Sequence, residues 1–285
     1  MTADLNHACE KEFMQNIPQQ YINVGIAEQN MIGIAAGLAL SGMKVFAYSI
    51  TPFVTMRCFE QVKIDVCYQN LDVNLIGVGA GFAYGPYGNT HCTIEDIAVM
   101  RVLPNMKIVS PANPLEAEQL TEQVIKSKGP FYLRLGRGKE PMPENNYAVK
   151  LGKGHIVNHG KDISLIAVGT IIDEAVKAAK ILEHQGISSE VINMHTVKPL
   201  DKDIIEDCIK HKKAIFTIEE HNVIGGLGSA VADVISQSKI NKQLIFKKFG
   251  VQDKYLKIIG DQNYLREKHG ISADAIAKTI LEILM

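Results

Sequence analysis

The fold is decided by residues 73–93, which read VNLIGVGAGFAYGPYGNTHCT and join a short apolar run to a loop that contains four glycines. A run of this length that is apolar almost without interruption is typical of a strand buried on both faces, as in a parallel sheet. Similar runs alternate with helical patterns in both directions along the chain. The stretch therefore indicates an α/β fold, with the loop at the carboxyl end of a strand.

Outward from this stretch, the apolar pattern predicts two successive sets of strands and helices. The expected strands are Val45–Ile50, Val73–Val78, Lys107–Ser110 and Phe131–Leu135, then Ile163–Val168, Glu190–Met194, Ala214–Ile218 and Leu244–Phe249. The expected helices are Glu28–Leu40, Val54–Tyr68, Ile94–Val102 and Pro114–Lys126, then Ile172–Gln185, Asp201–Cys208, Gly228–Ser236 and Ala273–Leu284. Asn113 and Ser272 are each placed to cap a helix. Two such alternations predict two three-layer α/β domains with mostly parallel sheets.

The boundary between the domains is predicted at residues 138–150, where glycine, proline and asparagine interrupt the pattern. We therefore expect a first domain over residues 1–137, a linker over 138–150 and a second domain over 151–285. The first expected strand comes late, whereas an α/β domain usually opens with one. Thr2–Leu5 is interpreted as the end of a strand whose upstream part is absent.

The composition excludes several classes of function. The chain has 285 residues, 46% hydrophobic and 21% charged, and its net charge of −1 gives no electrostatic basis for binding nucleic acid or an anionic membrane. Its five cysteines are scattered without a Cys-x-x-Cys pair, so neither a disulfide framework nor a zinc site is expected. Residues 1–20 are polar, and the longest apolar stretch is too short to span a membrane. A soluble, cytoplasmic protein is expected.

Glu28 lies in the run VGIAEQN at residues 24–30, at the start of a helix that is apolar almost all round and should be buried. A carboxylate in the first turn is favoured by the helix dipole, which is a purely structural explanation. A buried carboxylate also needs a partner or a raised pKa, and such groups are frequent in active sites. The residue pattern alone leaves both explanations open.

The glycine-rich loop Gly79–Thr93 lies where open α/β sheets collect ligands. Its glycines do not follow the G-x-G-x-x-G spacing, because Tyr84 takes the place of the third glycine. A dinucleotide-binding protein is therefore the least favoured interpretation. His91 closes the loop just before a predicted helix. It could be a mere neighbour of the helix cap, but a histidine in this place is more often functional.

Two more charged segments follow predicted strands. Arg134 and Arg137 are interleaved with glycine, a pattern suited to an anion such as a sugar phosphate. Solvent-exposed charge at a strand end is the competing explanation, more so for Arg134. The Glu-Glu-His run at residues 219–221 is not expected to bind a metal, because adjacent residues of an extended chain point to opposite faces and no second histidine lies at helical spacing.

Taken together, three segments resemble the transketolase family, most closely the C-terminal subunits of split transketolases. They are Tyr21–Met43 with its core GIAEQNM, Gly88–Met106 with Thr-His and LPNM, and Val191–Asp233 with EEHNVIGGLGS. The resemblance covers nearly the whole chain. It implies a thiamine-diphosphate pyrimidine-binding domain, then a transketolase C-terminal domain, in a transferase of carbohydrate metabolism.

The resemblance implies a role for each matching residue. Glu28 matches the glutamate that hydrogen-bonds N1′ of the aminopyrimidine, which favours the imino tautomer whose 4′-nitrogen removes the thiazolium C2 proton. Phe53 and Arg57 are similar to residues that wall the aminopyrimidine. His91 matches the histidine that contacts the donor's oxygen near the reacting carbon, and Arg137 resembles the arginine that holds the substrate phosphate. Glu28 and His91 are thus the expected catalytic residues.

The chain departs from the family pattern within the loop. Where the family usually has Asp-Gly-x-Thr-His, this chain has Tyr87-Gly-Asn-Thr-His, and Cys92 replaces the usual glutamine after the histidine. Tyr87 therefore replaces the aspartate that reads a substrate hydroxyl. We still expect Tyr87 to contact substrate, but the identity of the donor stays open. The family's upstream helix and first strand also have no counterpart in the sequence.

The diphosphate and metal motif of the family, Gly-Asp-Gly followed further on by Asn-Asn, has no match, since Gly260-Asp-Gln-Asn263 lacks the second glycine. The resemblance therefore implies an N-terminal partner subunit that carries the diphosphate-binding domain and holds Mg²⁺ or Ca²⁺. No metal ligand is expected in this chain. The expected assembly is a heterotetramer with thiamine diphosphate between two chains.

The leading hypothesis is transfer of a two-carbon ketol unit between sugar phosphates or nucleotide-linked sugars. The enzymatic alternative is a β-subunit-like component of a 2-oxo-acid decarboxylase or dehydrogenase, or an enzyme like deoxyxylulose-phosphate synthase. The alternative from another class is a non-catalytic module, a dimerisation or regulatory relic. It is suggested by the missing upstream segment and by Tyr87.

Overall fold

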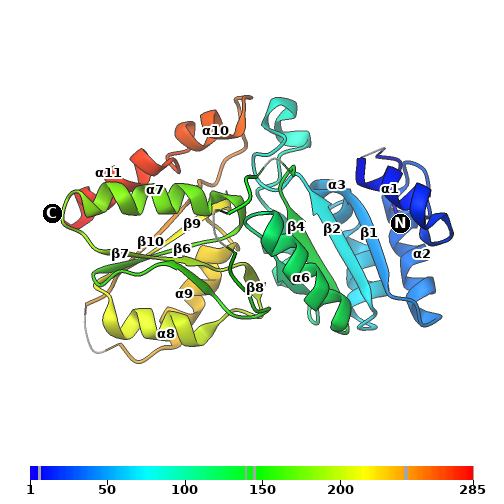
Figure 1. Cartoon of the computed structure of the whole chain (residues 1–285), viewed down its shortest axis with the longest axis horizontal. Helices are drawn as coiled ribbons and strands as arrows, with labels where there is room; N and C mark the ends of the chain where they lie inside the picture. The colour runs from blue at the N-terminus through cyan, green and yellow to red at the C-terminus, as the bar shows by residue number, and fades with distance from the viewer. Residues whose placement is uncertain (6–7, 139, 144–145, 241–242, 285) are drawn as a thin grey trace.

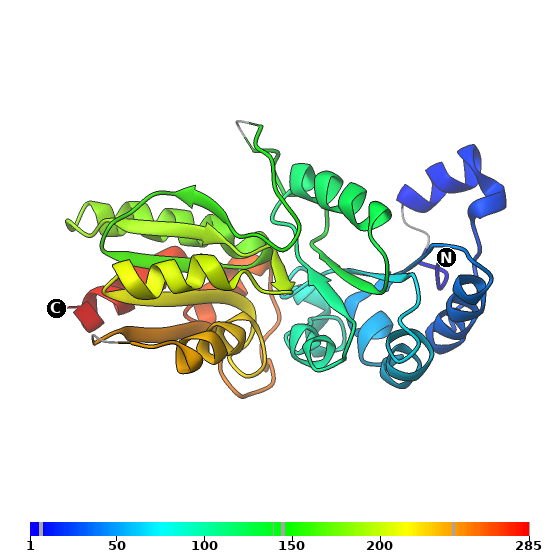
Figure 2. The ribbon, with the colours of Figure 1, turned by 90° about the horizontal axis from the view of Figure 1, so that it is seen from below.

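The computed structural model describes residues 1–5, 8–138, 140–143, 146–240 and 243–284 and contains two α/β units (Figure 1). Each unit is built around one sheet, and over these described residues each sheet has five strands. Helices lie on both faces of each sheet (Figure 2). Two three-layer α/β units with mostly parallel strands confirm the predicted fold class. Within the described ranges, none of the helices combines the length and the apolarity that crossing a membrane requires.

The sheet of the first unit has the strand order β1-β2-β4-β3-β8. Its strands are β1 (Val45–Ile50), β2 (Val73–Val78), β3 (Lys107–Val109), β4 (Phe131–Leu135) and β8 (Thr196–Lys198). The first four run parallel, as their continuous apolar runs predict. β8 comes from the second half of the chain and pairs antiparallel with β3, which the sequence pattern did not predict.

The helical elements of the first unit agree with prediction at α2 and α6. The elements are α1 (Ala8–Asn16), η1 (Pro18–Gln20), α2 (Glu28–Leu40), α3 (Thr51–Thr55), α4 (Phe59–Gln61), η2 (Val62–Cys67), η3 (Gly85–Thr90), α5 (Asp96–Arg101) and α6 (Pro114–Lys126). The Asn113 side chain accepts a hydrogen bond from the Glu116 backbone nitrogen at 3.1 Å, so Asn113 is the N-cap of α6 as predicted.

The single helix predicted over Val54–Tyr68 is wrong. The helical segment begins earlier, at Thr51, and is divided into α3, α4 and the π-helix η2. Thr55 Oγ1 donates to the backbone oxygen of Thr51 at 2.6 Å, and Cys58 Sγ donates to that of Phe53 at 3.1 Å. Such side-chain bonds to the backbone compete with a regular helical ladder, and apolar periodicity does not reveal them.

The second unit has the strand order β10-β9-β6-β7-β5. Its elements are β5 (His155–Asn158), β6 (Ile163–Ala167), η4 (Gly169–Ile171), α7 (Ile172–Glu183), β7 (Ser189–Asn193), α8 (Lys202–His211), β9 (Ala214–Asn222), α9 (Leu227–Gln237), β10 (Ile245–Val251), α10 (Gln262–Lys268) and α11 (Ala273–Leu284). β5 pairs antiparallel with β7, and the other pairs are parallel. Helices α7 and α11 cover one face, and α8 and α9 the other (Figure 1).

The predicted linker, residues 138–150, includes residues 139, 144 and 145, which lie outside the described residues. The part after them packs along α6. Gln119 donates from Nε2 to Tyr147 O at 2.7 Å and accepts at Oε1 from Val149 N at 2.9 Å. Gln123, one turn later on α6, donates to Val149 O and accepts from Leu151 N in the same way. One face of α6 thus satisfies the polar backbone groups of this segment.

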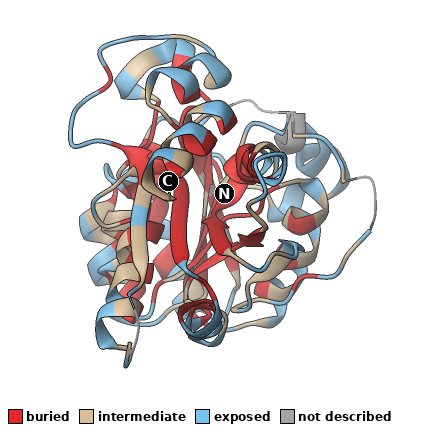
Figure 3. Ribbon diagram, turned by 90° about the vertical axis from the view of Figure 1, so that its left-hand side faces the viewer, coloured by how far each residue is buried: buried red, intermediate tan, exposed pale blue. Residues whose placement is uncertain are grey.

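Buried residues concentrate on the strands and on the inner sides of the helices (Figure 3). Alternate residues of β4 face opposite layers: Phe131 and Leu133 pack with α6, whereas Tyr132 belongs to the larger cluster that includes α2. Another cluster joins the units, because Phe82 and Cys92 of the glycine-rich loop pack with strands and helices of the second unit. The loop is therefore anchored in both units.

The amino-terminal residues lie beside β1. Thr2 makes single parallel bridges to Asn23 and to Tyr48. Its backbone nitrogen donates to Ile22 O at 2.9 Å. Strand pairing is thus limited to Thr2, because residues 3 and 4 form a bend in which Asp4 has a φ of +62°, so the interpretation of Thr2–Leu5 as the end of a strand is wrong beyond Thr2.

Candidate active site

Glu28 opens α2, and only 3% of the residue is exposed. Its Oε2 accepts a hydrogen bond from Arg57 Nη1 at 2.9 Å, in an ion pair whose arginine side chain is 45% exposed. Within the described residues, this is the one side-chain hydrogen bond of Glu28, which leaves Oε1 for a further donor. A buried carboxylate with one oxygen available therefore lies at the start of α2.

Phe53, in α3 just after β1, forms a wall beside this carboxylate. The guanidinium carbon of Arg57 lies 4.0 Å from the centre of the Phe53 ring, a cation–π contact. The Phe53 ring also meets the imidazole of His91 in a T-shaped contact, with 5.4 Å between ring centres. Burial, with a smaller contribution from the Glu28 carboxylate, raises the pKa of the neighbouring Cys58 thiol to about 12, so this thiol is neutral.

The glycine-rich loop after β2 presents His91 to this wall. The centre of its ring lies 5.2 Å from that of Tyr87 and 6.3 Å from that of Tyr84. Its Nδ1 lies 2.9 Å from Thr90 Oγ1, and the Thr90 hydroxyl donates to Tyr87 O at 3.3 Å. Thr90 therefore engages Nδ1, and which of the two donates depends on the tautomer of the ring. Within the described residues no side chain or backbone group is hydrogen-bonded to Nε2, which leaves it for a ligand.

Arg137 follows β4 and is exposed. Its guanidinium carbon lies 4.8 Å from the centre of the Tyr84 ring, and its Nη1 donates to Ala83 O at 3.3 Å. The backbone nitrogen of Arg137 donates to Glu140 Oε1 at 3.1 Å, which holds the end of β4 in place. A guanidinium has five N–H donors, so donors remain here for an anion.

The predicted site residues therefore lie in one continuous line of contacts, which we call the site line. It consists of Glu28, Arg57, Phe53, His91, Tyr87, Tyr84 and Arg137. Apart from Glu28, these residues follow the carboxyl ends of β1, β2 and β4, which is where ligands bind in parallel sheets. The structure brings the predicted residues together, and their individual roles stay predictions.

Tyr84 is the member of the site line that sequence reasoning missed. It is 7% exposed, and burial raises the pKa of its phenol, so the ring stays uncharged between His91 and Arg137. A side chain at Gly79 would place its Cβ 2.0 Å from the Tyr84 ring, at a φ of +88° that favours glycine. The sequence feature that could have identified Tyr84 is its place among several glycines, because small neighbouring residues leave room for an aromatic ring.

Both explanations given for Arg134, an anion site and solvent-exposed charge, are wrong. Arg134 is 3% exposed, and it donates from Nε to Asp96 Oδ2 at 2.7 Å and from Nη2 to Glu220 O at 3.0 Å. The Tyr132 hydroxyl donates to the same carboxylate at 2.6 Å. Burial alone would raise the pKa of Asp96, but the charge of Arg134 and the hydrogen bonds from Arg134 and Tyr132 hold it below its usual value. Arg134 therefore joins the two units.

The Glu-Glu-His run at residues 219–221 lies buried within β9, beyond the predicted end of that strand. Glu219 accepts hydrogen bonds from the backbone nitrogens of Leu227 and Gly228, at 2.7 and 2.8 Å, in the first turn of α9. His221 Nε2 accepts from a backbone nitrogen of α5 at 3.2 Å. Over the described part of the chain, no group of three or more histidine, cysteine or acidic residues is placed to hold a metal ion.

Two cavities lie near the domain junction. One, of about 470 Å³, adjoins Arg137 and is lined also by Tyr48, Asn113 and Thr170. It therefore lies beside the carboxyl end of β4, next to the site line.

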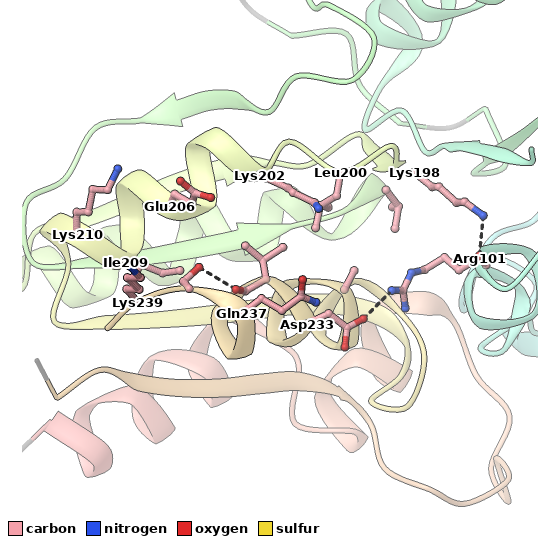
Figure 4. Close-up of a pocket in the computed structure, with 14 residues that line it drawn as sticks. Arg101, Lys198, Leu200, Lys202, Glu206, Ile209, Lys210, Asp233, Gln237 and Lys239 are labelled. Atoms are coloured by element: carbon pink, nitrogen blue, oxygen red, sulfur yellow. Dashed lines mark hydrogen bonds and ion pairs between the residues drawn. The ribbon is translucent and has the colours of Figure 1, made fainter. Parts of the chain in front are cut away.

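The other cavity, of about 630 Å³, lies between α8 and α9 and shares no lining residue with the site line (Figure 4). Two of its cationic groups already have partners. Arg101 donates to Gly225 O at 2.5 Å and pairs with Asp233, and Lys198 Nζ donates to the backbone oxygens of Arg101 and Leu103. This cavity is not part of the candidate site.

Models of two transketolase domains match the chain: the pyrimidine binding domain matches residues 1–142 and the C-terminal domain residues 152–276. The chain is 39% identical over 274 residues to an apulose-4-phosphate transketolase subunit from Actinobacillus succinogenes, covering 95% of this chain and 87% of that one. It is 37% identical over 286 residues to a putative transketolase C-terminal section from Methanocaldococcus jannaschii, covering 99% and 89%.

Among solved structures, one described as a split gene transketolase, inactive beta4 tetramer, is similar with a TM-score of 0.87 at 35% identity. The similarity covers 98% of this chain and 89% of that one. The two domain models together, the two relatives and the solved split gene transketolase each match nearly the whole of this chain. The chain therefore belongs to the transketolase family, whose enzymes depend on thiamine diphosphate.

Proposed function

We propose that this chain is the pyrimidine-binding subunit of a split transketolase and completes an active site together with a partner subunit. The reaction is the transfer of a two-carbon ketol unit between sugar phosphates or nucleotide-linked sugars. The observation that carries the proposal is the site line, which connects a buried carboxylate, an imidazole and an arginine along one edge of a parallel sheet.

The residues at the start of α2 fit an aminopyrimidine. Glu28 has a carboxylate oxygen available in a buried place, and Phe53 supplies a flat apolar face beside it. Glu28 would share a proton with a ring nitrogen, and burial strengthens such a hydrogen bond. Arg57 would orient the carboxylate through Oε2. When bound, thiamine diphosphate supplies the acidic carbon that accepts the ketol unit.

The rest of the site line would bind the sugar. His91 would hold or move a proton at the donor's oxygen near the reacting carbon through Nε2, because Nδ1 is occupied by Thr90. Tyr87, which is 60% exposed beside His91, would contact the sugar chain. Arg137 would hold the phosphate, for which a planar guanidinium offers paired donors.

A partner subunit is proposed because large apolar side chains are exposed near Glu28, among polar ones. Ile26 is 80% exposed, and the outer face of α2 carries exposed Gly33, Ile34 and Leu40. An exposed apolar patch beside a buried polar site is typical of a surface that another subunit covers. The partner would carry the diphosphate-binding domain and hold Mg²⁺ or Ca²⁺. The proposed assembly is a heterotetramer.

Two further observations support parts of this proposal. The names of two relatives, one a transketolase subunit and the other a split gene transketolase, describe divided enzymes.

Four cysteines are free and buried, namely Cys58, Cys67, Cys92 and Cys208. Reduced thiols are the rule in the cytoplasm, so we propose that location.

The proposal is tested by reconstitution. The chain is mixed with the product of its neighbouring gene, thiamine diphosphate and Mg²⁺, and ketol transfer is measured with a panel of phosphorylated and nucleotide-linked sugars. Transfer that requires both chains is the expected result. Release of carbon dioxide from pyruvate without ketol transfer would support the oxo-acid alternative. Calorimetry that detects no cofactor binding in any mixture would support the non-catalytic module.

A further inference from the structure

The glycine-rich loop that carries His91 is anchored in the second unit. Phe82 and Cys92, near the two ends of the loop, are 0% and 4% exposed. Both belong to a hydrophobic cluster whose other members are mostly residues of the second unit, Leu256 and Leu265 among them. The place of His91 therefore depends on how the second unit packs against the loop.

Asn89, two residues before His91, makes a polar contact with the second unit. Its Nδ2 donates to Leu256 O at 2.7 Å, and its Oδ1 accepts from Leu256 N at 3.1 Å. The Asn89 carboxamide thus binds both the backbone oxygen and the backbone nitrogen of Leu256, one with its donor and the other with its acceptor. Leu256 is 6% exposed, so its own burial fixes the backbone that Asn89 binds. This two-point contact restrains both the distance between the loop and Leu256 and the orientation of the loop relative to the second unit.

Glu220, on β9, holds the first part of the loop. Its Oε2 accepts from Phe82 N at 3.0 Å and from Gln262 Nε2 at 2.9 Å, and its Oε1 pairs with Arg266 Nε. A Cβ at Gly81 would lie 2.3 Å from Glu220 Oε2, so the loop backbone approaches the carboxylate as closely as glycine allows. The second unit thus binds the loop on both sides of its tip.

Between these two anchors, the loop turns tightly against residues 250–262. A Cβ at Gly85 would lie 2.3 Å from Gly260 O. Gly88 has a φ of +69°, and its oxygen accepts from the backbone nitrogens of His91 and Cys92 at 3.0 and 2.9 Å. The turn that presents His91 is therefore closed within the loop and supported from the second unit.

We propose that Asn89 is a positioning residue which, together with Glu220, couples the second unit to the loop and sets the place of the His91 imidazole. The inference rests on the proposed function, in which His91 contacts the donor substrate. All residues of the site line belong to the first unit. The inference therefore gives the second unit a defined part in the reaction.

The first test uses the chain reconstituted with its partner, thiamine diphosphate and Mg²⁺, and compares Asn89→Ala and Asn89→Asp with the unmodified chain. We expect kcat to fall about 10- to 100-fold in both, because a displacement of about 1 Å at a reacting group is enough for such a loss. The aspartate variant loses activity because a carboxylate cannot donate to Leu256 O. The Kd for thiamine diphosphate should change less than about twofold, since Glu28 is untouched.

The matched control is Asn158→Ala, which removes a carboxamide that donates to Ser189 O at 2.8 Å on the far edge of the second sheet. It should keep the kcat of the unmodified chain. In a double-mutant cycle with His91→Ala, the Asn89→Ala change should alter kcat less than about twofold, because Asn89 acts through His91. An equal loss with and without His91, or an unchanged kcat in Asn89→Ala, would overturn the inference.

Hydrogen exchange separates this inference from the proposed function. The amides of residues 83–92 should exchange faster in Asn89→Ala than in the unmodified chain, and Asn158→Ala should leave their exchange unchanged. Equal exchange in all three proteins would overturn the inference even if the complex proved inactive. A complex that transfers no ketol unit but shows the faster exchange would instead contradict the proposed function.

Discussion

Residues of the site line differ sharply in their surroundings. Glu28 is buried and paired with Arg57, whereas Tyr87 and Arg137 are exposed. The sequence could single out such residues, because a carboxylate that opens an apolar helix is chemically conspicuous. It could not show that Arg134 points inward, because a strand end alone does not reveal which side chains another unit covers. The orientation of Arg134 depends on tertiary contacts between residues that are far apart in the chain.

The exposed arginine allows a test of substrate recognition. Arg137→Ala should raise the KM of a phosphorylated donor about 10- to 100-fold, because a hydrogen bond to a charged group contributes about 1.5–3 kcal/mol. Steady-state kinetics with an unphosphorylated donor should show almost no change. Equal losses with both donors would contradict the role of Arg137 in holding phosphate.

The buried pair Asp96–Arg134 predicts a large effect on stability. Asp96→Asn leaves a guanidinium buried without its counter-ion, so the free energy of unfolding should fall by about 3–5 kcal/mol in urea titrations. Asp233→Asn is the matched control, because its pair with Arg101 has an aspartate side chain that is 67% exposed. That change should cost less than about 1 kcal/mol. Similar losses in the two variants would contradict this account.

The same carboxyl predicts a dependence on pH. Burial raises the pKa of Asp96, but the charge of Arg134 and the hydrogen bonds that Arg134 and Tyr132 donate outweigh it, so this pKa is lower in the folded chain than its usual value. Its contribution to stability is therefore complete above the unfolded pKa of about 3.9 and is lost as the pH falls through the folded pKa. Below about pH 4, the unfolding free energy of the unmodified chain should fall more steeply than that of Asp96→Asn. Parallel curves would refute this.

At the scale of elements, the sequence was most informative for three strands of the first sheet: β1, β2 and β4 have their predicted bounds. β2 and β4 lie inside the sheet and are apolar because both of their faces are buried, whereas β1 ends the strand order and alternates between buried and half-buried residues. The helix predicted over Val54–Tyr68 failed because hydroxyl and thiol bonds interrupt the backbone ladder. β8 was missed because three residues carry too short a pattern, and its pairing depends on the packing of one unit on the other.

The N-cap of α6 is an element-scale prediction. Asn113→Ala removes the acceptor of the Glu116 backbone nitrogen and the donor to the Tyr147 hydroxyl. The free energy of unfolding in urea should fall by about 0.5–2 kcal/mol. Asn113→Asp keeps the acceptor and should retain most of the stability. If the alanine variant is as stable as the unmodified chain, the cap contributes nothing.

At the scale of the whole molecule, the two units are fastened together. β8 joins the sheet of the first unit, the Arg134 pair reaches Glu220 O, and the loop of His91 enters the core of the second unit. Glu28, at one end of the site line, begins α2, and the outer face of this helix is exposed. The chain thus offers one half of the proposed active site, and under the proposed function a partner subunit would supply the other half.

The exposed face of α2 makes assembly testable. Ile34→Arg places a charge on the proposed interface, so it should block association with the partner subunit in sedimentation velocity experiments and abolish binding of thiamine diphosphate in calorimetry. Val157→Arg is the matched control, because Val157 is 43% exposed on β5 at the edge of the second sheet. It should assemble normally. Normal assembly of the Ile34 variant would show that α2 lies outside the interface.

The central claim is that Glu28 activates the cofactor, and the most direct measurement is the rate at which the thiazolium C2 proton of bound thiamine diphosphate exchanges with deuterium in the reconstituted complex. Glu28→Gln keeps the shape of the side chain but cannot exchange a proton with the pyrimidine. The account predicts that this variant still binds the cofactor but that exchange slows about 100-fold or more. Exchange at the unmodified rate in Glu28→Gln would contradict the account.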